Sequence, residues 1–542
     1  MKRKDFLQFS LIGTAAAGLT SLSGCTIKEQ ANKNAEKSNY QFELDEMAVG
    51  ELQEAMKAGR YTAESITRKY LDRIKEINQN GPQLNAILQV NPDAISIAQS
   101  LDAERSNGTV RGPLHGLPVV LKDNIETADR MNTTAGALAL KDHVAQNDSW
   151  LAKKLREAGA IILAKGNLSE WANFRSTRSS SGWSAIGGQT RNPNVLDRNP
   201  CGSSSGPGAA ASANLCTLAI GTETNGSIVC PASANGVVGI KPTLGLWSRS
   251  GIIPLAHSQD TAGPMTRTVT DAAILLGVLT GVDSSDEITA QSKGKSYTDY
   301  TQFLDRNGLN GARIGVARNY FGFHKETDEV MEEAVATMKE AGADIVDPVE
   351  LEPNEEWGQA GFDVLLYEFK ADLNNYLKTV SSEVEVETLA DIIAFNKEHR
   401  EESLPYFGQE ILEMDQEKGP LTDETYKNAL KKIRRLSREE GIDALMDEHN
   451  LDAIVAPTGG PAWPVDLVNG DHFGGGSSSM AARAGYPNIT VPAGYIHDLP
   501  VGISIFGTAW SEPKLLSIAY SFEQHRQARK IPAFRPNIGL PG

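Results

Sequence analysis

Short apolar runs alternate with helical segments along this chain, and the alternation limits the folds open to it. LPVVLK (117–122), IILAK (161–165) and CTLAIG (216–221) have the length and composition of buried strands. SWLAKKLREAGA (149–160), between the first two, has the start, the apolar spacing and the late glycine of a helix. Strands that alternate with helices are typical of an α/β fold, so we expect a largely buried sheet.

Residues 322–450 have a different pattern. They are charged, rich in Glu and helical in period, with few strand signals. Strand-like runs return at 452–458, 488–495 and 501–507. Because strands return after the helical stretch, we expect one domain, residues 45–540, with a helical insertion or cap at about 322–450.

The N-terminus has the pattern of an export signal. Basic residues 2–4 precede an apolar stretch at 6–22, which is short for a membrane span of about 20 residues. The sequence LSGC, which ends at Cys25, resembles the lipobox of bacterial lipoproteins. The resemblance implies a lipoprotein signal peptide at 1–25, lipidation of Cys25 and a polar, flexible tether at 26–44. We therefore expect an exported bacterial lipoprotein, membrane-anchored on the periplasmic or cell-surface side; an ordinary secretory signal is the alternative.

Charge and composition argue against several partners and cofactors. The 542 residues include 52 basic and 69 acidic side chains, whereas nucleic-acid-binding proteins usually present a basic face. HExxH and phosphate-loop patterns are absent, so we expect no metal and no cofactor. Cys201, Cys216 and Cys230 are odd in number and lack CxxC spacing, which predicts buried packing residues without a disulfide. We expect a monomer.

The motif GSSSG at 202–206 matches the G-x-S-x-G nucleophile elbow, with Ser204 as its central serine. An elbow requires a strand directly before it. Residues 191–201 contain two prolines and three asparagines, so they cannot form a core strand. No histidine is marked by its surroundings as a catalytic base, and we reject the elbow interpretation.

A second serine motif, GTETNGS, follows at 221–227. Its glycines, Gly221 and Gly226, allow a tight turn in which backbone N–H groups converge on one point. Such a turn can serve as an oxyanion hole, with Ser227 beside it as the nucleophile. Ser227 lies 24 residues after Ser203, so a helix and a strand can return the chain to its starting point.

Three motifs in order resemble the amidase signature family: HGLPVVLKDN, GSSSGPGAAASA and GTETNGSIVCPASANGVVGIKPT. The resemblance extends from about residue 45 to residue 530. It implies an α/β fold of the amidase-signature type, in which a mixed, twisted β-sheet core is covered on both sides by helices. It also implies hydrolysis of an amide bond without a cofactor.

The resemblance implies a Ser–Ser–Lys catalytic set that contains no histidine. Lys122 is the base, Ser203 relays the proton on a cis peptide bond, and Ser227 forms the acyl-enzyme. The remaining implied roles are an oxyanion hole at Thr224, Asn225, Gly226 and Ser227, with support from Ser204 and Thr222.

Lys122 can act as a base only if its pKa is lowered. A solvated lysine is protonated at neutral pH because its pKa is about 10.4, and burial disfavours the charged form. Lys122 ends the apolar run LPVVL, which suits a lysine carried into the interior. The alternative is a solvated lysine at the end of a strand, paired with Asp123.

This sequence departs from the usual family pattern near both serines. Cys201 and Ser205 replace glycines, Pro207 stands where Ser or Ala is common, and Asn225 stands where Gly is usual. Because Asn tolerates unusual backbone angles, we expect the oxyanion loop to be retained.

Further motifs resemble the bacterial peptide amidase branch, including NLSEWANFR (167–175), LLYEFKADL (365–373) and PTGGPAWP (457–464). Members of that branch hydrolyse the C-terminal carboxamide of peptides to the free acid and ammonia. Aromatic residues in these motifs are candidates to line the substrate pocket, although buried aromatics often belong only to the core. They are Trp171, Phe174, Tyr367 and Trp463.

Three other functions stay open at this point. One is hydrolysis of small-molecule or fatty amides on the same scaffold. Another is a surface lipoprotein that binds peptides without catalysis, against which the intact Ser–Ser–Lys set argues. The third is a transamidation subunit of the family, against which the export signal argues.

Overall fold

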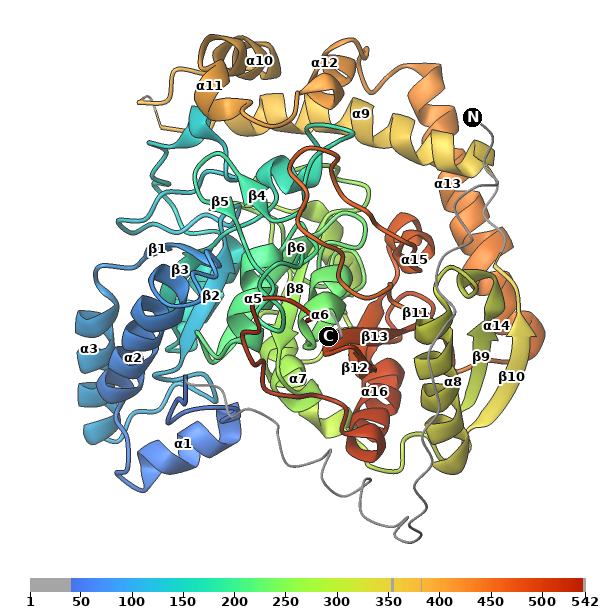
Figure 1. The fold of residues 1–542 in the computed structure, drawn as a ribbon, viewed down its shortest axis with the longest axis horizontal. Helices are drawn as coiled ribbons and strands as arrows, with labels where there is room; N and C mark the ends of the chain where they lie inside the picture. The colour runs from blue at the N-terminus through green and yellow to red at the C-terminus, as the bar shows by residue number, and fades with distance from the viewer. Residues whose placement is uncertain (1–39, 352–354, 382, 540–542) are drawn as a thin grey trace, which may run out of the picture. The chain divides into compact units, whose positions relative to one another are not determined.

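One eleven-stranded sheet runs through the protein in the computed structural model, which describes residues 40–351, 355–381 and 383–539 (Figure 1). The strand order is β1-β3-β2-β6-β8-β7-β12-β13-β11-β9-β10. The strands are β1 Ile87–Val90, β2 Pro118–Lys122, β3 Ile161–Gly166, β6 Leu218–Glu223, β7 Val238–Lys241, β8 Thr261–Thr266, β9 Arg313–Ala317, β10 Asp344–Val349, β11 Ala453–Pro457, β12 Asn488–Ile496 and β13 Leu499–Phe506. A separate hairpin pairs β4 Trp183–Ser184 with β5 Gly188–Gln189.

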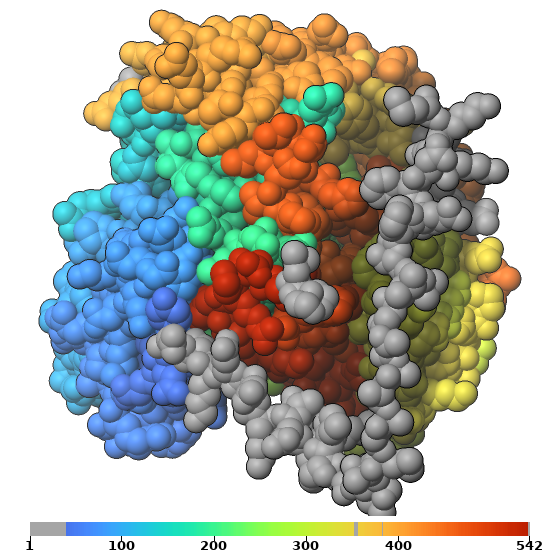
Figure 2. Space-filling view, viewed as in Figure 1, coloured from blue at the N-terminus to red at the C-terminus, as the bar shows by residue number. Residues whose placement is uncertain are grey.

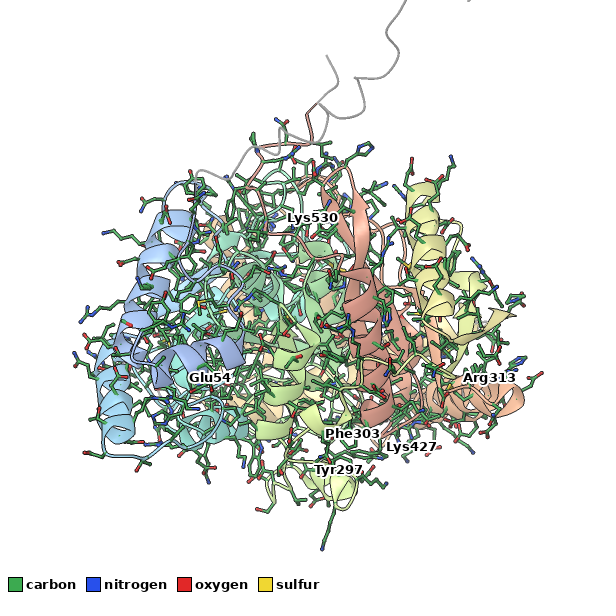
Figure 3. All side chains as sticks on the ribbon, turned by 90° about the horizontal axis from the view of Figure 1, so that it is seen from below. Glu54, Tyr297, Phe303, Arg313, Lys427 and Lys530 are labelled. Carbon is green, nitrogen blue, oxygen red and sulfur yellow. A yellow bond between two sulfur atoms is a disulfide. The ribbon has the colours of Figure 1, made fainter. Side chains whose placement is uncertain are left out.

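The sheet is mixed. Strand β2 pairs in parallel with β3 and β6, and β9 pairs in parallel with β10 and β11. The strands between these two groups, from β6 to β11, pair antiparallel. Figure 3 shows the protein from another side, with Glu54 of the N-terminal helix Val49–Lys57 on the left and Arg313 of β9 on the right.

Helices flank the sheet, as the sequence predicted. Every residue of β2, β3 and β6 is buried, which requires a covering layer on each face. The helices are α1 Val49–Lys57, α2 Ala63–Arg73, α3 Ala94–Ser106, α4 Trp150–Glu157, α5 Ser205–Ser212, α6 Val229–Asn235, α7 Val269–Val278, α8 Lys325–Glu340, α9 Glu355–Leu377, α10 Leu389–Glu398, α11 Arg400–Ser403, α12 Glu410–Gln416, α13 Glu424–Ser437, α14 Asp443–His449, α15 Ser478–Ala484 and α16 Glu512–Arg526.

Residues 322–450 are mostly helical, as expected, and α9 to α12 lie along one edge of the molecule (Figures 1 and 2). The same stretch also supplies β10, the last strand of the sheet, which the sequence pattern did not signal. Most of its residues are half-buried or exposed, and it contains Pro348. A mostly uncovered edge strand lacks the apolar run that marks a central strand.

The predicted signal peptide and Cys25 lie outside the described residues, as does most of the predicted tether. The described chain begins at Tyr40, and Leu44, at the end of the predicted tether, is fully buried in the core. Of the helices between residues 40 and 539 that are described, none is long and apolar enough to cross a membrane.

Small residues let α5 lie deep in the molecule, and its sequence SGPGAAAS is buried at every position. The helix packs against α6 and β6. At Gly206, an added Cβ atom would lie 2.3 Å from the carbonyl oxygen of Ala86 and 2.4 Å from the backbone nitrogen of Asn167. Close backbone contact therefore fixes the start of α5, where the GSSSG motif lies.

We predict that Gly206→Ala destabilises the fold by about 3 kcal/mol or more, because the clashing atoms are backbone and cannot move aside. Gly358→Ala is the matched control, since its Cβ atom in α9 would meet nothing within 4 Å. That variant should gain about 0.5–1 kcal/mol from helix propensity. The melting temperature should fall below the wild-type value for Gly206→Ala and rise slightly above it for Gly358→Ala. Equal melting temperatures for the two variants would contradict the packing argument.

Candidate functional site

Lys122 lies buried at the carboxyl end of β2. Its Nζ atom is 2.7 Å from Ser203 Oγ, 2.8 Å from Thr222 Oγ1 and 3.3 Å from the Thr222 carbonyl oxygen. Asp123 does not pair with it: the Asp123 carboxylate accepts from the backbone N–H of Thr134 at 3.1 Å and from the Thr134 hydroxyl. The alternative of a solvated Lys122 paired with Asp123 is therefore wrong.

Burial makes Lys122 a base near neutral pH. It lowers the pKa of Lys122 to about 7, although the negative charges of Asp260 and Glu223 raise it. A neutral amine has two N–H groups, which match the two oxygens of Thr222. Its lone pair is then left to accept a hydrogen bond from the Ser203 hydroxyl, as proton transfer to the amine requires.

Ser203 and Ser204 connect the lysine to the second serine motif. The Gly202–Ser203 peptide bond is cis, as the resemblance implied, and Ser203 is fully buried. The hydroxyl of Ser204 donates to the Thr222 carbonyl at 3.0 Å and accepts from the Thr222 N–H at 3.1 Å. The Ser204 N–H donates to the carbonyl oxygen of Ser227 at 3.2 Å. Ser204 thus joins the two motifs and is placed to support them.

The loop Thr224–Ser227 presents a row of free backbone donors. No residue that the structure describes accepts a hydrogen bond from its four backbone N–H groups. The next two N–H groups, of Ile228 and Val229, donate instead to the Glu223 carboxylate at 2.8 and 3.1 Å. Gly226 has φ +83°, in the left-handed region that favours glycine. The loop has the donors that an oxyanion hole needs.

Asn225, which stands where the family usually has Gly, holds this loop in place. Its side-chain oxygen accepts from the Ser478 hydroxyl at 2.8 Å, and its Nδ2 donates to Ser479 Oγ at 3.1 Å. Both serines belong to the first turn of α15. On the other side, the Thr224 hydroxyl donates to Asp260 at 2.6 Å. The loop is therefore anchored at two points beside its free N–H groups.

The Ser227 side chain makes no hydrogen bond to the part of the chain that the structure describes. The residue is 8% exposed. Within the same part of the chain, no hydrogen bond joins Ser203 Oγ to Ser227 Oγ. Catalytic hydrogen bonds are often long without substrate and shorten when it binds.

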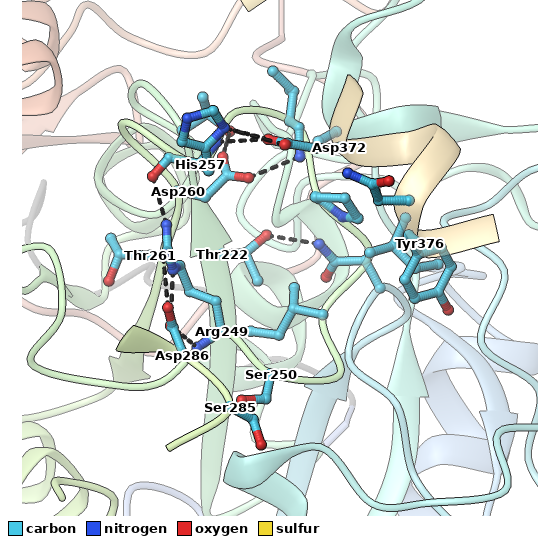
Figure 4. A pocket seen from close by; sticks show the side chains of 18 residues that line it. Thr222, Arg249, Ser250, His257, Asp260, Thr261, Ser285, Asp286, Asp372 and Tyr376 are labelled. Atoms are coloured by element: carbon cyan, nitrogen blue, oxygen red, sulfur yellow. Dashed lines mark hydrogen bonds and ion pairs between the residues drawn. The ribbon is translucent and has the colours of Figure 1, made fainter. Parts of the chain in front are cut away.

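A cavity of about 390 Å³ reaches the site through Asn124, Thr222 and Thr224 (Figure 4). One part of its wall is apolar and includes Ile253 and Leu255. The other part is charged: Arg249 pairs with Asp286 at 2.7 Å, and His257 with Asp372 at 2.9 Å. The remaining lining residues are Ala172, Ser250, Ile252, Pro254, Asp260, Thr261, Ser285, Asn375 and Tyr376.

None of the four aromatic residues predicted to line a substrate pocket lines this cavity. Trp171 and Phe174 pack edge-on against Phe369, with ring centroids 6.3 and 5.6 Å apart. Tyr367 packs against Tyr426, and Trp463 packs against Phe473 and lies in a cluster with Cys201. All four are buried. The structure places them in the apolar clusters that surround the site.

Two residues of the site escaped the sequence reasoning. Asn124 donates to Thr222 Oγ1 at 3.0 Å, and it lies inside the HGLPVVLKDN motif, two positions after Lys122. Asp260 accepts from Thr224 and raises the pKa of Lys122, but it is 138 positions away from that lysine in the chain. The HGLPVVLKDN motif could have pointed to Asn124 as a site residue. No local sequence pattern marks Asp260.

Cys201 and Cys230 form a disulfide, so the prediction of packing residues without a disulfide is wrong for this pair. Cys216 is a buried free thiol, as predicted. The two bonded cysteines are 29 positions apart and follow no sequence pattern that indicates pairing. They meet only because the fold brings the two serine motifs together.

One group of potential metal ligands occurs in the described chain: His257, Glu368 and Asp372 have ligand atoms within 4.8 Å of one another. The three side chains already pair among themselves, since His257 Nδ1 is 2.9 Å from Asp372 and Nε2 is 3.5 Å from Glu368. Glu368 also accepts from the Tyr426 hydroxyl at 2.7 Å. These contacts join α9 to the 255–260 loop at the cavity.

The fold and its relatives define the class of protein, an amide hydrolase. Residues 65–516 match the family model Amidase, and the chain belongs to this family. A probable amidase of Arabidopsis thaliana is 40% identical over 526 residues, covering 95% of this chain and 97% of that protein.

Solved structures of peptide amidases resemble the whole folded region. The peptide amidase PAM, in complex with the competitive inhibitor chymostatin, is 50% identical with a TM-score of 0.88, covering 91% of this chain and 100% of that one. The native peptide amidase from Stenotrophomonas maltophilia is 49% identical with a TM-score of 0.87 and the same coverage.

We predict that kcat/KM for amide hydrolysis rises with pH through an apparent pKa near 7, as expected when the neutral Lys122 amine must accept a proton. Asp260→Asn removes a negative charge that raises this pKa, so the acid limb should shift to lower pH. Initial rates across mildly acidic to alkaline pH test both statements. An acid limb that Asp260→Asn leaves in place would contradict the assignment to Lys122.

Proposed function

We propose that this amide hydrolase removes ammonia from the C-terminal carboxamide of peptides, with Lys122, Ser203 and Ser227 as its catalytic residues. The observation that carries the proposal is the buried Lys122 amine, 2.7 Å from Ser203 Oγ, next to the loop that carries Ser227 and its free N–H groups. This set supplies a base, a relay, a nucleophile and an oxyanion hole without a metal.

Acylation begins when Ser227 Oγ attacks the carboxamide carbon. The Ser227 proton passes to Ser203 Oγ while the Ser203 proton passes to Lys122 Nζ, which becomes an ammonium. The carbonyl oxygen gains the negative charge and accepts hydrogen bonds from the N–H groups of the 224–227 loop. The C–N bond then breaks, and the proton returns through Ser203 to the leaving nitrogen, which departs as ammonia.

Deacylation repeats the relay with water in place of the serine. Lys122, again neutral, draws a proton through Ser203 from a water that attacks the ester carbonyl. The second tetrahedral intermediate collapses, the ester C–O bond breaks, and Ser227 recovers its proton. The products are the free carboxylic acid and an unchanged enzyme.

The peptide substrate is supported by the peptide amidase relatives at 49 and 50% identity, which cover 91% of this chain. The cavity beside Thr222 and Thr224 is large enough for a side chain, and its wall is part apolar and part charged. A small-amide hydrolase on the same scaffold would use the same catalytic residues. The two functions therefore differ only in which amides react.

We predict that a panel of peptide amides and free carboxamides releases ammonia from the peptide amides only. Ser227→Ala and Lys122→Ala should each lower kcat by about 10⁴-fold or more, as loss of a nucleophile or base does elsewhere. Faster release from simple or fatty carboxamides would select the small-amide alternative. Equal activity in Ser227→Ala would exclude the mechanism.

A serine-directed phosphonate separates catalysis from peptide binding alone. It should label the wild-type protein and leave Ser227→Ala unlabelled, because the reactive oxygen belongs to that residue. A wild-type protein that binds peptide amides but neither reacts with the phosphonate nor releases ammonia would be a binding lipoprotein.

We also propose that the protein is an exported, lipid-anchored monomer that contacts the membrane only through Cys25 and does not bind nucleic acid. The basic residues 2–4, the apolar stretch and LSGC support export. The Cys201–Cys230 disulfide supports it independently, because disulfides persist in oxidising compartments.

Lipidation predicts that the wild-type protein incorporates a fatty-acid label in bacteria and sediments with membranes. Cys25→Ser should lose the label and appear in the soluble fraction, because it lacks the acceptor thiol. Cys216→Ser, which changes a buried free thiol, is the matched control and should stay with the membranes. A labelled, membrane-bound Cys25→Ser would contradict anchoring at this residue.

A further inference from the structure

The Cys201–Cys230 disulfide directly flanks both serines of the proposed catalytic set. Cys201 lies two residues before Ser203, and Cys230 lies three residues after Ser227. Cys201 is 5% exposed and Cys230 is half-buried. The bond therefore joins the segment that carries Ser203, the proposed relay, to the segment that carries Ser227, the proposed nucleophile.

Noncovalent contacts between the two serines themselves are few. The hydrogen bond from the Ser204 N–H to the Ser227 carbonyl is the one that the described residues form between 202–204 and 225–228. The two hydrogen bonds between the Ser204 hydroxyl and Thr222 lie before the 224–227 loop, so the Ser204 N–H makes the one contact to Ser227 itself. The disulfide adds a covalent link between the residue two positions before Ser203 and the residue three positions after Ser227.

Local contacts orient each cysteine. The Cys201 N–H donates to Asn199 Oδ1 at 2.8 Å, and the Cys201 carbonyl accepts from the Ser205 hydroxyl at 2.6 Å. The Cys230 N–H donates to the Gly226 carbonyl at 2.8 Å, within the oxyanion loop itself. A movement of Cys230 is therefore transmitted to Gly226 and Ser227 through one hydrogen bond.

We propose that the Cys201–Cys230 disulfide is a positioning element that holds Ser227 in line with Ser203, and that reduction of this bond slows the amidase. The proposal rests on the proposed function of Ser203 and Ser227. A dithiol reductant supplies the chemistry: its thiolate attacks one sulfur, the S–S bond breaks, and a second attack releases two cysteine thiols and the oxidised reductant. Two electrons pass from the dithiol to the protein disulfide.

Misplacement of a reacting group by about 1 Å can cost about 100-fold in rate. We therefore expect kcat to fall between about 10-fold and 100-fold on reduction. KM should change little, because most of the cavity lining comes from other segments, chiefly the 249–261 region and α9. Labelling of Ser227 by a phosphonate should slow by the same factor as kcat.

The test compares wild type with Cys201→Ser/Cys230→Ser and with Cys216→Ser. Each protein is assayed for kcat and KM on the most active peptide amide, with and without a dithiol reductant, and alkylation counts the thiols released. The double variant should be slow in both conditions, whereas Cys216→Ser should behave as wild type, since its thiol is buried and unbonded. Re-oxidation of reduced wild type should restore kcat.

A purely structural role predicts a different result. The melting temperature would fall on reduction while kcat, measured well below that temperature, stayed at the oxidised value; this outcome overturns the proposal. If the double variant does not fold, reduced wild type that keeps its circular dichroism spectrum decides the question. A failure of the proposed function is separate, because oxidised wild type would then release no more ammonia than Ser227→Ala.

Discussion

The site depends on a lysine amine kept away from water at the end of a buried strand. The same burial that lowers the pKa of Lys122 to about 7 opposes folding, because the unfolded chain holds this proton up to its usual pKa. Between these two values the unfolded state binds more protons, so stability rises with pH across that window and the full penalty applies below it. At neutral pH the folded state is therefore less stable than it would be with a solvated lysine. At the same pH, part of the Lys122 amine is deprotonated.

Sheet topology brings Lys122 and the loop that carries Ser227 together. Strands β2 and β6 are parallel neighbours, and Leu121 lies opposite Ile220. Their carboxyl ends therefore meet at one edge, where Lys122 reaches Thr222 and the chain continues into the 224–227 loop. The small residues of α5 let the turn before this helix, which carries Ser203, approach the same edge. Neither strand alone could place an amine beside two serine loops.

Features that depend on residues close together in the chain could be predicted from the sequence. The apolar runs that became β2, β3 and β6, and the interior placement of Lys122, follow from burial patterns and motif order. The Cys201–Cys230 disulfide, by contrast, depends on two loops meeting in space, and its 29-residue separation carries no signal. Most of the cavity lining was missed for the same reason: apart from Thr222 and Thr224, it comes largely from the 249–261 region and from α9, where Phe369 packs in an apolar cluster.

The proposed catalytic residues and most of the cavity lining come from different parts of this chain. Lys122 lies at the end of β2, Ser203 on the turn before α5 and Ser227 on the loop after β6. The cavity is closed on one side by Asp372, Asn375 and Tyr376 of α9 (Figure 4). The pairing of His257 with Asp372 and Glu368 connects α9 to the 255–260 loop that precedes β8. Substitutions on α9 can therefore alter which amides fit while the lysine and serines keep their geometry.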